Sequence, residues 1–260
     1  MLRVVPSAVR FAIGALVLIS LIRAPSALAQ GISIGSGGKL DLGSAKIDLG
    51  CTPFQVAAGG SATLDSGQIV GGTDVGNAGQ LDAGSATVQA SGDWSNNGTF
   101  LAGTSLVALQ DGCGRPSSTL SGDSSFFRFT DNTTSGRTLV FTAGRTQRVS
   151  SALTLAGTTG NRLHIRSSSP GSPGFLELAS TGTQSIAEVD VQDNHELVTG
   201  QVIAPGPPVA FNSVDSGGNS RWFLDNGQVE RVAEVPTLSG AGAVLLACAL
   251  FAAYCWTQRA

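Results

Sequence analysis

The chain has 260 residues, which is enough for one long domain or two small ones. Charged residues make up only 13%, and 35 glycines and regularly spaced aliphatic residues favour a turn-rich all-β protein over a helical or disordered one. The formal charge of −3 would become −6, with 12 basic and 18 acidic residues, if a leader carrying Arg3, Arg10 and Arg23 were removed, which argues against nucleic acid as a partner and against electrostatic adhesion to anionic lipid.

Residues 1–29 have the three parts of a secretory signal peptide. Two arginines flank the start of an apolar run of 12 residues, FAIGALVLISLI, and Ala27-Leu28-Ala29 offers small residues to a signal peptidase. We therefore expect cleavage between Ala29 and Gln30. A retained membrane anchor is the alternative, although 12 apolar residues are too few to span a bilayer comfortably.

An internal repeat follows the leader. Residues 79–88 (GQLDAGSATV) align with residues 98–107 (GTFLAGTSLV) at an offset of 19, and each copy is a short alternating strand, a glycine corner and a second short strand. A unit of this length cannot close a core alone, so it buries its apolar side chains by stacking on its neighbours. The repeat therefore predicts a solenoid.

The same pattern extends over residues 30–226, which we expect to form one domain. Segments 39–49 and 61–70 also alternate apolar and polar residues around a glycine. Corner glycines at 43, 67, 84 and 103 are spaced by 24, 17 and 19 residues. This irregular period favours a single right-handed parallel β-helix of about ten coils over a β-propeller, whose blades are longer. Another all-β solenoid or a sandwich is the alternative.

The segment around Phe126, Phe127 and Phe129 departs from the repeat. It predicts either an exposed aromatic patch or interior side chains, and the usual burial of phenylalanine favours the interior.

Four cysteines separate into two pairs. Cys248 and Cys255 lie in an apolar tail, and Cys51 and Cys113 lie in the body. Export to an oxidising compartment favours a disulfide between Cys51 and Cys113 over two buried free thiols.

One polar cluster comprises Asp190, Asp193, His195 and Glu196, with Asp215 further along. Carboxylates of this kind bind calcium in some β-helix enzymes that cleave acidic polysaccharides. Val189-Asp190-Val191 also reads as an ordinary strand and Asp193-Asn194 as an ordinary turn. We therefore predict no catalytic, metal or cofactor site, and His164 as a solvent-facing strand residue.

Residues 138–223 resemble a recurring closing segment of bacterial surface β-helix proteins. The resemblance rests on the segments FTAGRTQ (141–147), LHIRSS (163–168), VDVQD (189–193) and NSVDSGGNSRWF (212–223). It implies that Trp222 and Phe223 cap the last coil.

The tail resembles the IPTL-CTERM sorting signal of Gram-negative bacteria. Val235-Pro236-Thr237-Leu238-Ser239 precedes an apolar stretch, residues 241–256, and a basic Arg259. Val235 stands in place of the pattern's isoleucine. The resemblance implies that residues 227–239 are a linker and sorting motif, that residues 240–260 carry a transmembrane segment, and that an exosortase-type enzyme recognises the tail. A plain C-terminal anchor is the alternative, since 16 apolar residues span roughly 24 Å of a core of about 30 Å.

These features together predict the location and the role. We expect an exported protein, anchored in the inner membrane by its C terminus and then sorted to the cell surface or medium, with a structural or adhesive role and no enzymatic activity. The alternative is a β-helix that binds or cleaves surface polysaccharide with its Asp190–Glu196 face.

Overall fold

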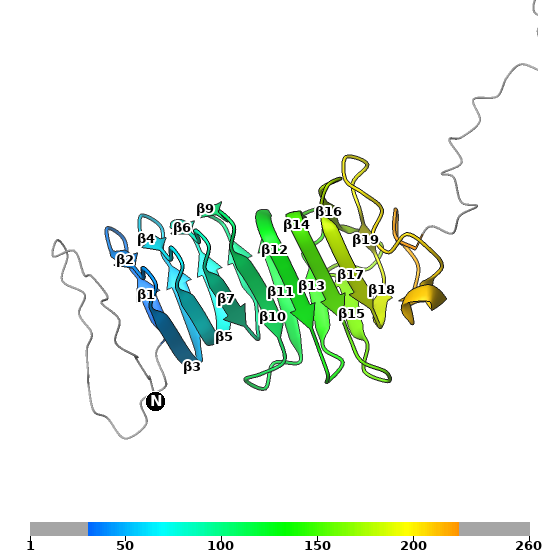
Figure 1. The fold of residues 1–260 in the computed structure, drawn as a ribbon, viewed down its shortest axis with the longest axis horizontal. Helices are drawn as coiled ribbons and strands as arrows, with labels where there is room; N and C mark the ends of the chain where they lie inside the picture. Colours follow the sequence, from blue (N-terminus) through cyan, green and yellow to red (C-terminus); the bar gives the residue numbers. More distant parts are fainter. Residues whose placement is uncertain (1–30, 224–260) are drawn as a thin grey trace, which may run out of the picture. The chain divides into compact units, whose positions relative to one another are not determined.

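Residues 31–223 are described by the computed structural model, and they form a parallel β-solenoid of about eight turns. Its 20 strands are joined by turns and one short 3-10 helix, η1 (Pro208–Phe211). Figure 1 shows the strands stacked along the axis in sequence order, from blue to yellow. Every pairing between these strands is parallel, which confirms the prediction of an all-β parallel solenoid.

Pairing sorts the strands into three stacks, which we call faces A, B and C. Face A contains β1 (Ile32–Ile34), residues 54–56 of β3 (Lys46–Val56), residues 75–77 of β5 (Gln68–Asn77), β8 (Trp94–Asn96), β11 (Ser117–Gly122), β13 (Thr138–Phe141), β15 (Leu163–Ser167), β18 (Val189–Val191) and β20 (Val214–Asp215).

Each coil continues from face A to face B and then to face C. Face B contains β2 (Lys39–Asp41), β4 (Ser61–Thr63), β6 (Gln80–Asp82), β9 (Thr99–Leu101), residues 124–126 of β12 (Ser124–Asn132), residues 147–149 of β14 (Thr146–Ala156), β16 (Gly174–Leu178) and β19 (Asn194–His195). Face C contains residues 46–48 of β3, residues 68–70 of β5, β7 (Thr87–Ala90), β10 (Leu106–Gln110), residues 128–132 of β12, residues 152–156 of β14 and β17 (Thr183–Ala187).

The internal repeat is in register. Leu81 pairs with Phe100 and Val88 pairs with Val107, so the offset of 19 read from the sequence is the rise of one coil. Later coils are longer, and Ile165 pairs with Val191 at a separation of 26. The predicted ten coils are therefore about eight, because corner loops in the second half take up residues that the short repeat does not contain.

Four turns join face B to face C with left-handed backbone at their second residue. Gly43, Gly84 and Gly103 have φ of 57°, 51° and 54°, and Asp65 has φ of 49°. The prediction of Gly67 as the corner is wrong: its N–H closes the turn to the Leu64 carbonyl at 2.8 Å. The spacings become 22, 19 and 19, a more regular repeat that the sequence conceals because aspartate also tolerates this conformation.

Inward side chains form columns along the axis. On face A the column Phe54, Val75, Trp94, Leu120 and Phe141 is in register from coil to coil, and each member is no more than 1% exposed. No single coil could bury these side chains, so apolar burial is gained only by stacking.

The aromatic segment fills the interior, as predicted. Phe126 and Phe129 are each 1% exposed, with ring centroids 4.9 Å apart, and Phe126 packs 5.3 Å from Trp94. Phe127 is the exception: it is only partly buried, at the register shift where β12 turns from face B to face C.

Trp222 and Phe223 end the described chain and are buried, as the resemblance implied. Trp222 pairs with Ile203, and its indole N–H donates to Asn194 Oδ1 at 3.0 Å. Among residues 31–223 no helix is long and apolar enough to cross a membrane. The predicted cleavage site at Ala29 and Gln30, the motif Val235–Ser239 and the segment 240–260 lie outside the described residues.

Candidate functional site

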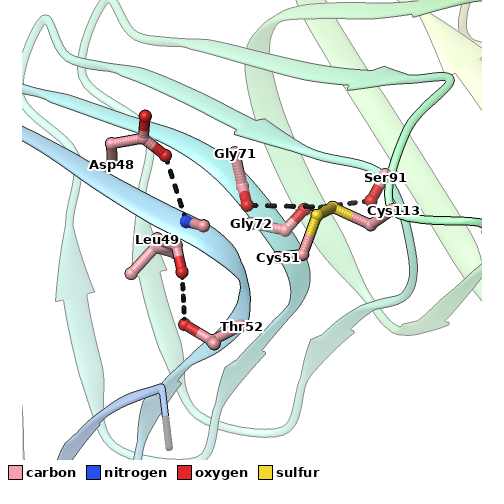
Figure 2. The surroundings of a disulfide bond; sticks show 9 residues. Asp48, Leu49, Cys51, Thr52, Gly71, Gly72, Ser91 and Cys113 are labelled. Atoms are coloured by element: carbon pink, nitrogen blue, oxygen red, sulfur yellow. Dashed lines mark hydrogen bonds between the residues drawn. A yellow bond between two sulfur atoms is a disulfide. The ribbon is translucent and has the colours of Figure 1, made fainter. Parts of the chain in front are cut away.

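A disulfide joins Cys51 and Cys113, as predicted, with Cα atoms 5.4 Å apart. Cys51 lies at the corner where β3 turns from face C to face A, and Cys113 lies in the loop between β10 and β11. Figure 2 shows the bond at the surface of this corner, beside Gly71, Gly72 and Ser91. Both cysteines have left-handed backbone, with φ of 64° and 50°.

The loop of residues 111–116 runs back along the solenoid, and we call it the strap. Gly71–Gly72 and Ser91–Gly92 form the corners of the two coils between Cys51 and Cys113, and Cys113 Sγ lies 3.9 Å from the Gly71 carbonyl oxygen (Figure 2). A Cβ at Gly92 would lie 2.7 Å from Arg115 Nε, so the corner has room for the strap only because this residue has no side chain.

Arg115 holds the strap at a second point. Its guanidinium Nη2 lies 2.7 Å from Asp74 Oδ1 and 3.4 Å from Asp93 Oδ2. Asp74 Oδ1 also accepts the Asp93 N–H at 2.8 Å, and Asp93 Oδ1 accepts the Thr119 N–H at 2.7 Å. The strap thus fixes two carboxylates that begin successive strands of face A.

A groove of about 460 Å³ lies on face A beside these carboxylates. The polar residues that line it are Gln55, Asp74, Asp93, Asn77, Ser95 and Asn97. Gly76 lies on its floor, in register with Gln55 on one side and Ser95 on the other. The groove therefore follows the face across three coils.

A further carboxylate, Asp111 at the start of the strap, fixes the next corner. It accepts hydrogen bonds from the backbone N–H groups of Thr134 and Ser135 at 2.7 and 3.0 Å, and from the hydroxyls of Thr133, Thr134 and Ser135. Burial by itself raises the pKa of Asp111, but these hydrogen bonds outweigh it and lower the pKa to about 2.

Asp131 and Arg137 form an ion pair inside the solenoid. Both side chains are fully buried, with Arg137 Nη1 3.7 Å from Asp131 Oδ1, and Arg137 also donates to the Ser91 carbonyl at 2.9 Å and to the Ser118 hydroxyl. Burial raises the pKa of Asp131 to about 6, and the Arg137 charge opposes part of that rise.

The predicted polar cluster is divided among separate partners. Asp190 accepts from Arg166 at 2.8 Å and from the Ser216 hydroxyl at 2.6 Å, with His164 Nδ1 3.2 Å away. Burial raises its pKa, but the hydrogen bonds from Arg166 and Ser216 lower it more, so the net shift is downward. His164 is 39% exposed on its strand, as predicted.

The other cluster members lie at turns or in the interior. Asp193 accepts the Gly171 N–H at 3.0 Å, and Asp215 accepts from Asn219 at 2.7 Å. Glu196 is 3% exposed and pairs with Arg221 at 2.6 Å, and burial raises its pKa. Within the described part of the chain, no three His, Cys, Asp or Glu side chains are placed to hold a metal ion.

Sequence reasoning missed the strap contacts of Arg115 and Asp111 and the buried pair of Asp131 and Arg137. The run DGCGRP (111–116), in which two glycines flank a cysteine, was the available signal of a tight return. The charge pair inside the solenoid had no comparable signal.

The fold and the bridged corner define residues 31–223 as a disulfide-strapped parallel β-solenoid. Comparison of the chain with protein-family models, with curated proteins and with solved structures found no match.

Proposed function

We propose that the protein is an exported structural or adhesive component of the Gram-negative envelope or cell surface. The Cys51–Cys113 disulfide carries this proposal, because such bonds persist in oxidising compartments outside the cytoplasm. The signal-peptide pattern before Gln30 and the sorting pattern at Val235–Ser239 support the same destination.

The body suits a load-bearing or adhesive role because its stacked strands are tied together by backbone hydrogen bonds and by the strap. We expect a right-handed coil, the usual hand of parallel crossovers. Its outward positions carry mostly short polar side chains, which present a wide hydrated surface.

Processing requires two partners on this proposal. A signal peptidase cuts between Ala29 and Gln30, and an exosortase-type enzyme recognises Val235–Ser239 while segment 240–260 holds the chain in the inner membrane. Cleavage of polysaccharide by the Asp190–Glu196 face has less support, because Asp190 and Glu196 are each paired with a different arginine.

Intact mass of the native protein, recovered from envelope and medium under non-reducing conditions, tests the proposal. We expect a chain that begins at Gln30, ends near residues 235–239 and has lost two hydrogens to the disulfide. A Pro236→Ala, Thr237→Ala variant should retain Ala260, whereas Gln228→Ala in the linker should be processed normally. A chain that keeps its leader and is found in the cytoplasm would overturn the proposal, and a native chain that keeps Ala260 would overturn the sorting step.

A further inference from the structure

One row of outward residues on face A changes character at the groove. Ser33, Gln55, Gly76, Ser95 and Ser121 follow one another in register along this row. Gly76 is the member without a side chain, so the row is hollow at the middle of the groove. The φ of Gly76 is not in the left-handed region, so its backbone does not require glycine.

Polar groups surround this hollow. At the corner with face C lie Asp74 and Asp93, with side chains 32% and 45% exposed and oriented by Arg115. Toward face B lies Asn97, which is exposed and donates to the Ser95 hydroxyl at 3.3 Å. Gln55 covers the third side, since a Cβ at Gly76 would lie 2.0 Å from its Oε1.

The charge and chemistry of the lining select a ligand class. Two carboxylates face one guanidinium that they already neutralise, so an anionic ligand such as a phosphate or a uronate would be repelled. The lining contains no aromatic or large apolar side chain other than valine, so an apolar ligand would gain little. Carboxylate and amide groups instead accept from and donate to neighbouring hydroxyls.

We propose that this groove binds a neutral oligosaccharide, with Asp74, Asp93 and Asn97 as its hydrogen-bonding residues and Gly76 as the opening that admits the sugar. A volume of about 460 Å³ lies in the usual range of ligand sites. The inference gives a ligand class to the proposed adhesive role and rests on that role.

Titration calorimetry of the mature, oxidised protein tests this proposal with three probes, cellohexaose, maltohexaose and chitohexaose, and with tetragalacturonate as the acidic comparison. At least one neutral hexasaccharide should bind with a dissociation constant below about 1 mM, at least tenfold tighter than tetragalacturonate. Asn97→Ala should weaken this binding.

The variant Gly76→Thr tests the location. Its side chain meets only the flexible end of Gln55, so the solenoid should fold, and affinity for the sugar should fall at least tenfold. Ser33→Thr is the matched control, because Ser33 lies in the same row outside the groove and should bind as the unmodified protein does.

Failure of all three neutral probes to bind, tighter binding of tetragalacturonate, or unchanged affinity in Gly76→Thr would each overturn the proposal. These measurements use purified protein, so they are independent of the mass measurement that tests export and sorting. A negative binding result with a processed chain would remove the sugar ligand and leave the surface role standing.

Discussion

Cys51 and Cys113 are 62 positions apart in the chain, yet their Cα atoms are 5.4 Å apart, because the strap carries Cys113 back past two intervening corners. A solenoid is otherwise held by contacts between neighbouring coils alone. This bond therefore links coils that do not touch through their strands, and Arg115 adds ion pairs to the coils between them.

Replacing both cysteines, Cys51→Ser with Cys113→Ser, should lower the free energy of unfolding by about 4 kcal/mol, the chain-entropy value for a loop of this length. Urea unfolding measures the loss, and hydrogen exchange should show it concentrated in residues 31–116. Reductant should destabilise the unmodified protein similarly and leave the double variant unaffected. Equal stability of oxidised and reduced protein would refute the role of the strap.

Asp131→Asn should destabilise the protein by about 3–5 kcal/mol at pH 7, because it leaves the buried Arg137 charge without its partner. The raised pKa means that the folded state binds the proton more tightly than the unfolded state. The contribution of Asp131 to stability is therefore present below about pH 4 and lost as pH rises through about 6.

Unfolding of Asp131→Asn at pH 5 and pH 7 checks this sign. The destabilisation should be smaller at pH 5, where Asp131 of the folded protein is largely neutral already. Asp65→Asn, at an exposed corner, serves as the control and should differ little from the unmodified protein at either pH. A larger loss at pH 5 than at pH 7 would contradict the prediction.

Asp111→Asn should show the opposite pH dependence. The pKa of Asp111 is lowered, so its contribution is present above its usual pKa near 4 and is lost as pH falls toward 2. The substitution should cost about 1–3 kcal/mol at pH 6 and progressively less toward pH 2, because hydrogen bonds to a charged acceptor are lost. Urea midpoints at pH 2.5, 4 and 6 measure this, and a constant loss across that range would be inconsistent with it.

Asn77→Ala should lower the free energy of unfolding by about 2–4 kcal/mol. Asn77 is 1% exposed, its side-chain amide donates to Asn96 Oδ1 and to the Thr99 carbonyl at 2.9 Å each, and its oxygen accepts the Gly79 N–H. Truncation leaves these buried groups unpaired. Asn97→Ala is the matched control: its side chain is exposed, so thermal or urea unfolding should change by less than about 0.5 kcal/mol.

Much of the architecture could be predicted because the stacking repeat is local and periodic. The offset of 19 between residues 79–88 and 98–107 became the pairing of Leu81 with Phe100. The corner at Asp65 and the number of coils were predicted wrongly, since aspartate can replace glycine at a left-handed position and corner loops vary in length.

The sequence by itself determined the parallel solenoid, the burial of Phe126 and Phe129, and the Cys51–Cys113 pair, because alternation, composition and cysteine count act along short stretches or leave one pairing. Only the tertiary structure decided that the strap crosses two coils, that Asp131 meets Arg137 in the interior, and that Gly76 opens a groove between Gln55 and Ser95. These contacts join residues from different coils. Their register depends on the length of every corner loop between them, and no local pattern encodes that sum.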